Sequence, residues 1–139
     1  MTRQPDEFDF QRAFCIWLDG NPDRDGVPRV QPALAPGVVY WHTPNSGEGR
    51  SALQGKLLKQ SGVKAGIHDL LFLRPTQFTE GVFGLLFGME WKKPGGVLSA
   101  AQRMMHTRLM RAGMAASIVV DNLKDARAFC YENKLTVGL

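Results

Sequence analysis

The chain has 139 residues, of which 44% are hydrophobic and 22% are charged, and its formal net charge at pH 7 is +4. This composition is ordinary for a globular protein, so it argues against disorder and predicts one domain over residues 1–139. No apolar run reaches the ~18 residues of a membrane span, and acidic residues near the start give the N-terminus no signal-peptide character. We expect a cytoplasmic protein without a membrane partner.

Basic residues are concentrated in the middle of the chain, whereas the acidic residues are concentrated before residue 50. A net positive charge fits a polyanionic partner, although each basic side chain could equally lie on a solvated helix face. The two cysteines, Cys15 and Cys130, have neither Cys-x-x-Cys nor Cys/His zinc spacing. We predict that both are reduced and partly buried.

The first predicted element is a helix from about residue 7 to residue 18, because Phe10, Phe14, Trp17 and Leu18 recur at helical spacing. Residues 19–37 contain four prolines, Pro22, Pro28, Pro32 and Pro36, and little periodicity. They predict a long, Pro-rich loop insertion. We expect it to be flexible, although long irregular connections can also contact a partner.

A short strand is predicted at 38–41, followed by a Gly/Ser/Pro loop at 42–49 and a helix at 50–60 that Gly62 ends. The loop offers backbone N–H groups near a helix start, a setting that accepts phosphate. Apolar runs at 67–73 and 83–91 predict two strands. A turn at Arg74-Pro75-Thr76 would join them as an antiparallel hairpin.

After the break at Pro94-Gly95-Gly96, the sequence predicts a helix from Ser99 to about residue 112, a strand at 115–120 and a helix at 123–133. The predicted order is α-β-α-β-β-α-β-α. It indicates an α/β fold in which helices flank a mixed β-sheet.

Polar residues mark the two central strands: Asp69 opens the first apolar run, and Glu90 and Lys92 close the second. The period of two places Glu90 and Lys92 on one face of a strand and Trp91 on the other. Carboxylates suit Mg²⁺, which takes one or two of them and keeps waters for its substrate. A lysine beside such an ion can position a water that attacks a phosphodiester, so the pattern predicts metal-dependent phosphodiester cleavage.

Each of these residues also has a structural interpretation. Asp69 could cap a turn, and Glu90 and Lys92 could form a surface ion pair of little energetic value. Glu90 follows the apolar run Leu85-Leu86-Phe87, however, where a buried charge is costly without a partner ion. This favours the catalytic interpretation.

Four segments carry a resemblance to a known family. They are Asn45-Ser46-Gly47 with Arg50, Gly62-Val63-Lys64-Ala65-Gly66-Ile67-His68-Asp69-Leu70, Met89-Glu90-Trp91-Lys92-Lys93-Pro94-Gly95-Gly96, and Leu98-Ser99-Ala100-Ala101-Gln102. Together they resemble the VRR-NUC domain of the PD-(D/E)xK nuclease superfamily, over residues 7 to 133. His68 stands where that family usually has proline, and the Val-Arg-Arg triplet of the family name is absent.

The resemblance implies a restriction-endonuclease-like core and Mg²⁺- or Mn²⁺-dependent cleavage of DNA, often of branched DNA such as flaps or four-way (Holliday) junctions. By position, Asp69 and Glu90 match the metal carboxylates, and the backbone carbonyl of Trp91 matches a further ligand. Lys92 matches the catalytic lysine. Gln102 matches a glutamine near the attacking water.

Two of the implied roles compete with plain alternatives. Ser99-x-x-Gln102 is also a capping box for the helix that begins there. Glu7 looks like the acidic residue that the family's first helix contributes to the metal site, with Asp9 as a weaker substitute. Glu7 could equally be an exposed first-turn glutamate that the helix dipole favours. We expect no histidine to bind metal, although His42 could touch a phosphate.

In the mechanism that follows, basic residues would hold the DNA backbone with little base readout, so that binding weakens with salt. We assign this role to the basic residues Arg50, Lys56, Lys59, Lys64, Lys93 and Arg103, and we name the neutral Asn45 as a further DNA-binding residue. A four-way junction needs two cuts and a chain of this size offers one centre, so we expect a homodimer. The alternative is a basic nucleic-acid-binding module that keeps the fold without cutting.

Overall fold

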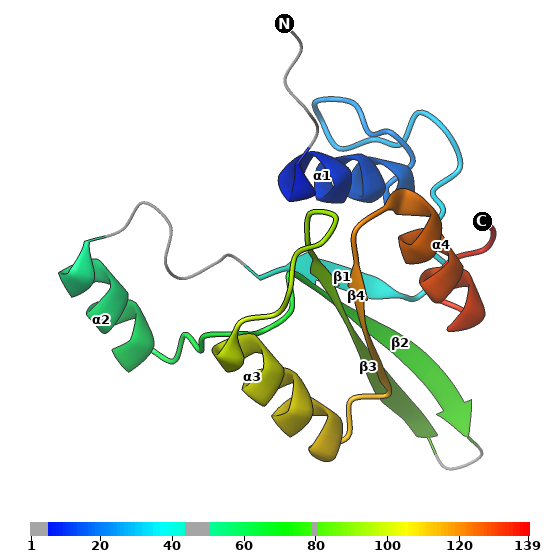
Figure 1. The fold of residues 1–139 in the computed structure, drawn as a ribbon. Coiled ribbons are helices and arrows are strands. Elements are labelled where there is room, and N and C mark those ends of the chain that lie inside the picture. The colour runs from blue at the N-terminus through cyan, green and yellow to red at the C-terminus, as the bar shows by residue number, and fades with distance from the viewer. Residues whose placement is uncertain (1–5, 44–50, 79–80) are drawn as a thin grey trace, which may run out of the picture.

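The computed structural model describes residues 6–43, 51–78 and 81–139 (Figure 1). Its elements are α1 (Glu7–Leu18), β1 (Val39–His42), α2 (Ala52–Gln60), β2 (Leu70–Phe78), β3 (Gly81–Trp91), α3 (Ala100–Arg111), β4 (Ala116–Val120) and α4 (Leu123–Glu132). The prediction of a mixed sheet flanked by helices is confirmed. Within the described ranges, no helix is both long enough and apolar enough to cross a bilayer.

The four strands form one sheet in the order β1-β2-β3-β4. Strands β1 and β2 pair antiparallel, as do β2 and β3, whereas β3 and β4 pair parallel through the crossover that contains α3. The predicted antiparallel hairpin of the two central strands is therefore confirmed. Its register sets Leu70 opposite Met89 and so brings the start of β2 beside the end of β3.

The predicted turn at Arg74-Pro75-Thr76 is wrong, because β2 runs through these residues to Phe78. The strand also begins at Leu70 rather than at Ile67. Pro75 pairs with Gly84 of β3, but the pairing of β2 with β1 ends at Leu73. On its other edge Pro75 has no strand partner, so its missing N–H costs the ladder no hydrogen bond.

One face of the sheet packs against α1 and α4 and forms the hydrophobic core (Figure 1). The core side chains from the two central strands are Leu70, Phe72, Phe87, Met89 and Trp91, all buried. On α1, Phe14 lies with its ring centroid 5.5 Å from that of Trp91, and on α4, Phe129 meets Phe87 edge-on at 6.5 Å. Each such buried side chain contributes about 2 kcal/mol of transfer free energy. Burial of Met89 and Trp91 in this core therefore holds the end of β3 in place.

The other face carries Gly88 and Glu90 and lies under α3. There the ring of His68 stacks on that of His106 from α3, with centroids 3.6 Å apart, and the Nε2 atom of His68 lies 2.5 Å from Ser117 Oγ on β4. Gly88 makes room for this stack, because a Cβ at that position would lie 2.6 Å from the His68 ring. The stack holds α3 against the sheet directly beside Asp69.

The Pro-rich loop at 19–37 has no helix or strand, as predicted, but its backbone is held to the rest of the domain. The N–H of Leu34 donates to the carbonyl of Leu18, and the N–H of Ala35 donates to the carbonyl of Leu135. Ala33 is buried. These contacts contradict the expected flexibility, because the loop packs between α1 and the C-terminal segment.

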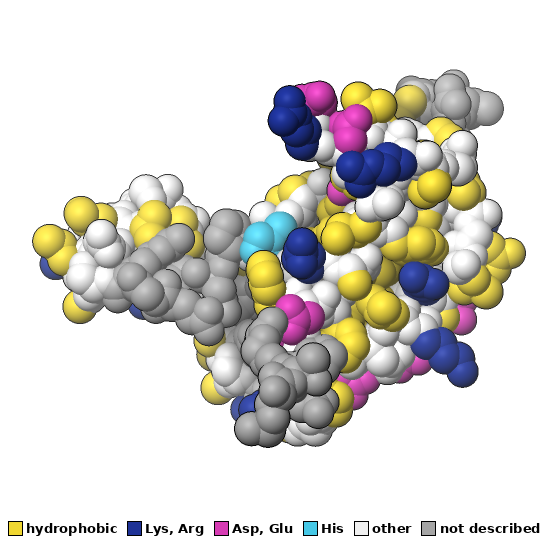
Figure 2. Space-filling view, turned by 90° about the horizontal axis from the view of Figure 1, so that it is seen from above, with side chains coloured by type: hydrophobic (Ala, Val, Ile, Leu, Met, Phe, Trp, Pro, Cys, Tyr) yellow, Lys and Arg dark blue, Asp and Glu magenta, His cyan; other side chains and the backbone are white. Residues whose placement is uncertain are grey.

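Helix α2 stands apart from the other helices (Figure 1). None of its residues is buried, and Leu53 and Leu57 are 65% and 55% exposed. In the space-filling view, hydrophobic side chains lie on the surface of this projecting part (Figure 2). The helix is stabilised locally by a capping box between Ser51 and Gln54.

Both cysteines are free thiols, which confirms the prediction that they are reduced. Cys130 on α4 is buried and Cys15 on α1 is half-buried. Burial raises the pKa of Cys15 to about 11 and that of Cys130 to about 12. Thiols in such surroundings are unreactive, so they belong to the core.

Candidate metal centre

Asp69 and Glu90 meet at one end of the central hairpin. Asp69 directly precedes β2 and Glu90 is the penultimate residue of β3. The backbone N–H of Trp91 donates to Asp69 Oδ2 at 2.8 Å, and the backbone N–H of Asp69 donates to Glu90 Oε2 at 3.1 Å. These two hydrogen bonds fix both carboxylates relative to the sheet.

Two further predicted site residues converge on the second oxygen of Glu90. The side-chain N–H of Gln102 donates to Glu90 Oε1 at 2.6 Å, and Lys92 Nζ lies 3.8 Å from the same oxygen. Lys92 follows β3 directly, so it keeps the side of the strand that the period of two assigned to it. The structure therefore brings Asp69, Glu90, Lys92 and Gln102 together.

Gln102 forms the capping box and also contacts Glu90, while its role near an attacking water stays a prediction. Its Oε1 accepts a hydrogen bond from the backbone N–H of Ser99 at 2.8 Å, and its own backbone N–H donates to Ser99 Oγ at 3.1 Å, which completes the capping box. Its amide nitrogen is left to bind Glu90. One side chain thus anchors the start of α3 and orients a carboxylate.

The electrostatics of the carboxylate pair are unfavourable when both groups are ionised. Glu90 is 2% exposed. Burial, and next the charge of Asp69, raise the pKa of Glu90, while Lys92 opposes the shift. Burial also raises the pKa of Asp69, against the hydrogen bond from the Trp91 N–H. Paired carboxylates with raised pKa values are typical of functional sites, where a cation can relieve the repulsion.

The structure brings together two carboxylates as candidate ligands for a divalent cation. Within residues 6–43, 51–78 and 81–139, no group of three or more His, Cys, Asp or Glu side chains is arranged to hold a metal ion. The candidate ligands in this part of the chain are two carboxylates, those of Asp69 and Glu90. Mg²⁺ and Mn²⁺ suit such oxygen ligands, and Mg²⁺ commonly binds through one or two carboxylates and keeps several waters.

The remaining predicted ligands lie at the edge of this centre. Glu7 is the first residue of α1 and is exposed, and its charge contributes to the raised pKa of Asp69. The indole of Trp91 lies in the core on the opposite side of β3. Its backbone N–H binds Asp69, and the role of its carbonyl as a ligand stays a prediction.

The predicted DNA-binding residues are spread along one part of the chain. Lys56 and Lys59 lie on α2, Lys64 in the loop after it, Lys93 after β3 and Arg103 on α3, and all five are exposed. Arg103 donates to the carbonyl of Leu98 at 2.7 Å. Lys59 and Lys64 line a common pocket. Asn45 and Arg50 lie outside the described residues.

The sequence did not single out the polar contact that joins α1 to the candidate metal centre. Gln11 is buried on α1, with Nε2 3.0 Å from His42 Nδ1, and that same ring atom lies 2.9 Å from the backbone carbonyl oxygen of Asp69. Nδ1 accepts from Gln11 in one tautomer and donates to Asp69 in the other. The signal available in the sequence was a polar residue, Gln11, at an otherwise apolar helical position.

Comparison of the chain with family models, with curated proteins and with solved structures gives no match. The functional assignment therefore depends on the geometry of the metal centre and on the sequence segments that resemble the VRR-NUC domain. The geometry is the stronger of the two, because it joins residues far apart in the chain.

Proposed function

We propose that this protein is a Mg²⁺- or Mn²⁺-dependent endodeoxyribonuclease with a VRR-NUC-like site on a restriction-endonuclease-like core. The observation that carries the proposal is the convergence of Lys92 and Gln102 on one oxygen of Glu90, whose other oxygen binds the backbone of Asp69. The buried carboxylate of Glu90, the half-buried carboxylate of Asp69 and a nearby lysine form a set of groups that could support metal-assisted hydrolysis of a phosphodiester.

Each residue has a defined task in this mechanism. Asp69 and Glu90 would hold the ion, which when bound supplies a Lewis acid for the scissile phosphate and a water of lowered pKa. Lys92 would orient the attacking water and offset the negative charge that develops on the phosphate. Gln102 keeps Glu90 Oε1 in place through its 2.6 Å hydrogen bond, so it would act by positioning the carboxylate.

The substrate that fits the charge distribution is DNA, bound through its phosphates. The net charge is +4, and Lys56, Lys59, Lys64, Lys93 and Arg103 are exposed. Contacts of this kind release counterions, so affinity should fall with salt and show little sequence preference. We propose branched DNA, such as a flap or a four-way junction, as the preferred substrate and a homodimer as the form that makes paired cuts.

The experiment that tests the proposal is a cleavage assay on labelled linear duplex, single strand, flap and four-way junction, with Mg²⁺, with Mn²⁺ and with chelator. We expect metal-dependent cuts that Lys92→Ala abolishes while its thermal unfolding stays cooperative. Lys124→Ala, an exposed change on α4, is the matched control and should cut like the wild type. Salt-dependent binding without metal-dependent cleavage of any substrate would instead support the non-catalytic nucleic-acid-binding module.

A further inference from the structure

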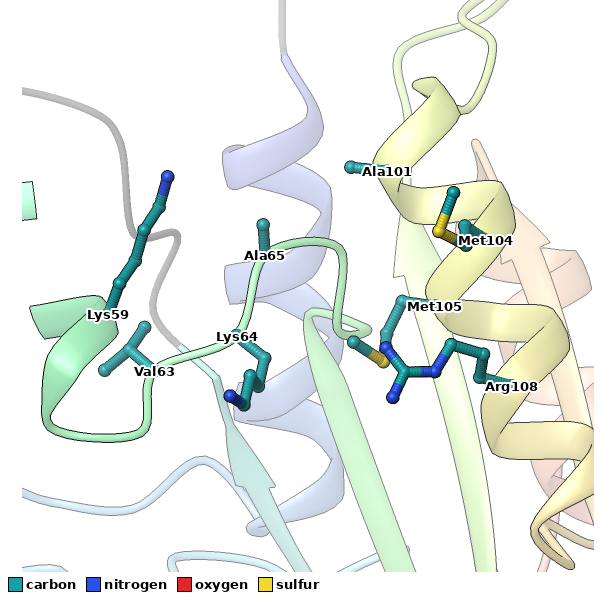
Figure 3. A pocket seen from close by; sticks show the side chains of 8 residues that line it. All are labelled: Lys59, Val63, Lys64, Ala65, Ala101, Met104, Met105 and Arg108. Carbon is teal, nitrogen blue, oxygen red and sulfur yellow. The ribbon is translucent and has the colours of Figure 1, made fainter. Parts of the chain in front are cut away.

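A pocket of about 330 Å³ lies between the C-terminal end of α2, the loop that follows it and α3 (Figure 3). We call it the α2–α3 pocket. Its lining residues are Lys59, Val63, Lys64, Ala65, Ala101, Met104, Met105 and Arg108. In Figure 3, Met105 and Arg108 point from α3 toward the loop that carries Val63 and Ala65. The volume is within the ~300–1,000 Å³ typical of small-ligand sites.

The lining combines apolar side chains with positive charge. Val63, Met104 and Met105 supply the apolar part, and Lys59, Lys64 and Arg108 the charge. No acidic residue belongs to the lining, and none of the three cationic side chains forms an ion pair or hydrogen bond with another residue in the described part of the chain. Unpaired cations beside an apolar surface fit a ligand that carries both a flat apolar group and an anionic group.

The pocket adjoins the metal centre. Ala101 immediately precedes Gln102, which binds Glu90. The loop meets α3 at Gly66, where a Cβ would lie 2.4 Å from the carbonyl oxygen of Ala101. This close approach, made with a φ of +85° that favours glycine, ties the pocket wall to the segment that leads into Asp69.

We propose that the α2–α3 pocket binds one unpaired nucleotide of a single-stranded branch. The base lies on the Met104 and Met105 side chains, whose thioethers make favourable contacts with aromatic rings. Its phosphates are held by Lys59, Lys64 and Arg108. Proteins that bind single strands combine a basic groove with aromatic side chains on which bases stack, and here the two methionines take the place of the aromatic side chains. The inference rests on the proposed nuclease function and specifies how that site would select a branch.

The test is a binding measurement that needs no catalysis. Fluorescence anisotropy in chelator compares a flap duplex with a blunt duplex of the same length for the full chain. Arg108→Ala should weaken flap binding about tenfold and blunt-duplex binding less than about twofold, since a hydrogen bond to a charged group is worth about one decade in affinity. Arg111→Ala is the matched control, because Arg111 lies on the same helix outside the pocket lining.

A second variant tests the apolar wall. Met104 is 65% exposed, so Met104→Glu should fold, and it places a negative charge where the base would lie. We expect it to lower flap affinity about tenfold and to leave the affinity for blunt duplex nearly unchanged. Met110→Glu, on the same helix but outside the pocket, should not change flap selectivity.

Failure of this inference and failure of the nuclease proposal give different results. If both pocket variants weaken flap and blunt duplex equally, or change neither, the nucleotide pocket is refuted even when the wild type cleaves DNA. If the variants lose flap selectivity in chelator while the wild type cuts nothing with any metal, the pocket stands and the nuclease proposal falls.

Discussion

Replacing Glu90 by glutamine tests whether the Glu90 carboxylate binds a metal ion or has only a structural role. Glu90 is buried beside Asp69, and burial and the charge of Asp69 raise its pKa from 4.5 to about 8. In the absence of metal, the folded protein therefore keeps a proton that an unfolded chain has released at neutral pH. This difference in protonation lowers the free energy of unfolding of the wild type. Glutamine does not titrate, so we expect Glu90→Gln to be more stable than the wild type in chelator.

The magnitude follows from the pKa shift. At pH 7, a glutamate with these two pKa values lowers the free energy of unfolding by about 3 kcal/mol. Glutamine offers one acceptor oxygen to the two donors that bind Glu90, the Asp69 N–H and the Gln102 amide, and losing one of these bonds costs about 1 kcal/mol. The net gain should be about 1–2 kcal/mol, or roughly 5 °C in Tm for a domain of this size.

The assay is thermal unfolding of both proteins in chelator between about pH 5 and pH 8, repeated with Mn²⁺. Because the folded pKa of Glu90 is raised, its contribution favours the folded state at low pH and is lost as pH rises from 4.5 toward 8. The stability advantage of the variant should therefore grow with pH, while other titrating groups cancel in the difference. Mn²⁺ should raise the Tm of the wild type and have little effect on the variant.

Two results would refute this reasoning. One is a variant that is less stable than the wild type in chelator at pH 7, with a difference that does not change with pH. Glu90 would then be ionised in the folded protein and adequately stabilised by Lys92 and the N–H donors. The other is an equal Mn²⁺-induced rise in Tm for both proteins, which would place the ion elsewhere.

Two further substitutions test how the segments around the site are held. Gly66→Ala should destabilise the fold by about 2 kcal/mol or more, because the φ of this residue is +85° and an added Cβ would clash with the α3 backbone. The control is Gly55→Ala on α2, where an added Cβ would meet no atom within 4 Å. Calorimetry should show this control to be neutral or slightly stabilising. Gln102→Glu keeps the capping-box oxygen but loses the amide donor to Glu90. Cleavage should fall at least about tenfold with cooperative unfolding retained, whereas unchanged cleavage would show that Gln102 only caps the helix.

Much of the candidate metal centre could be predicted from local patterns. Glu90 and Lys92 share a side of β3 because side chains alternate along any strand, and Lys92 Nζ is indeed 3.8 Å from Glu90 Oε1. The capping box of Ser99 and Gln102 depends on a separation of three residues, and it forms as the spacing indicates. Such features need no knowledge of the rest of the chain.

Other parts depended on contacts that no local pattern specifies. Pro75 is an acceptable strand residue because β1 is too short to reach it, so the hairpin turn lies further along than the Arg-Pro-Thr triplet indicated. His42 approaches Asp69 because β1 pairs antiparallel with β2. The side of the sheet that each helix covers decided that Gln11 meets His42 and that His106 stacks on His68.

The sequence by itself determined the order of the helices and strands and the position of the two carboxylates at strand ends, since periodicity, caps and alternation act over a few residues. Only the tertiary structure decided that Glu90 accepts from the Asp69 N–H and Asp69 from the Trp91 N–H, that Gln102 reaches Glu90, and that α2 and α3 line a basic pocket. These pairs are separated by 12 or more residues. Their meeting depends on strand register and on burial of the apolar core, which are properties of the whole chain.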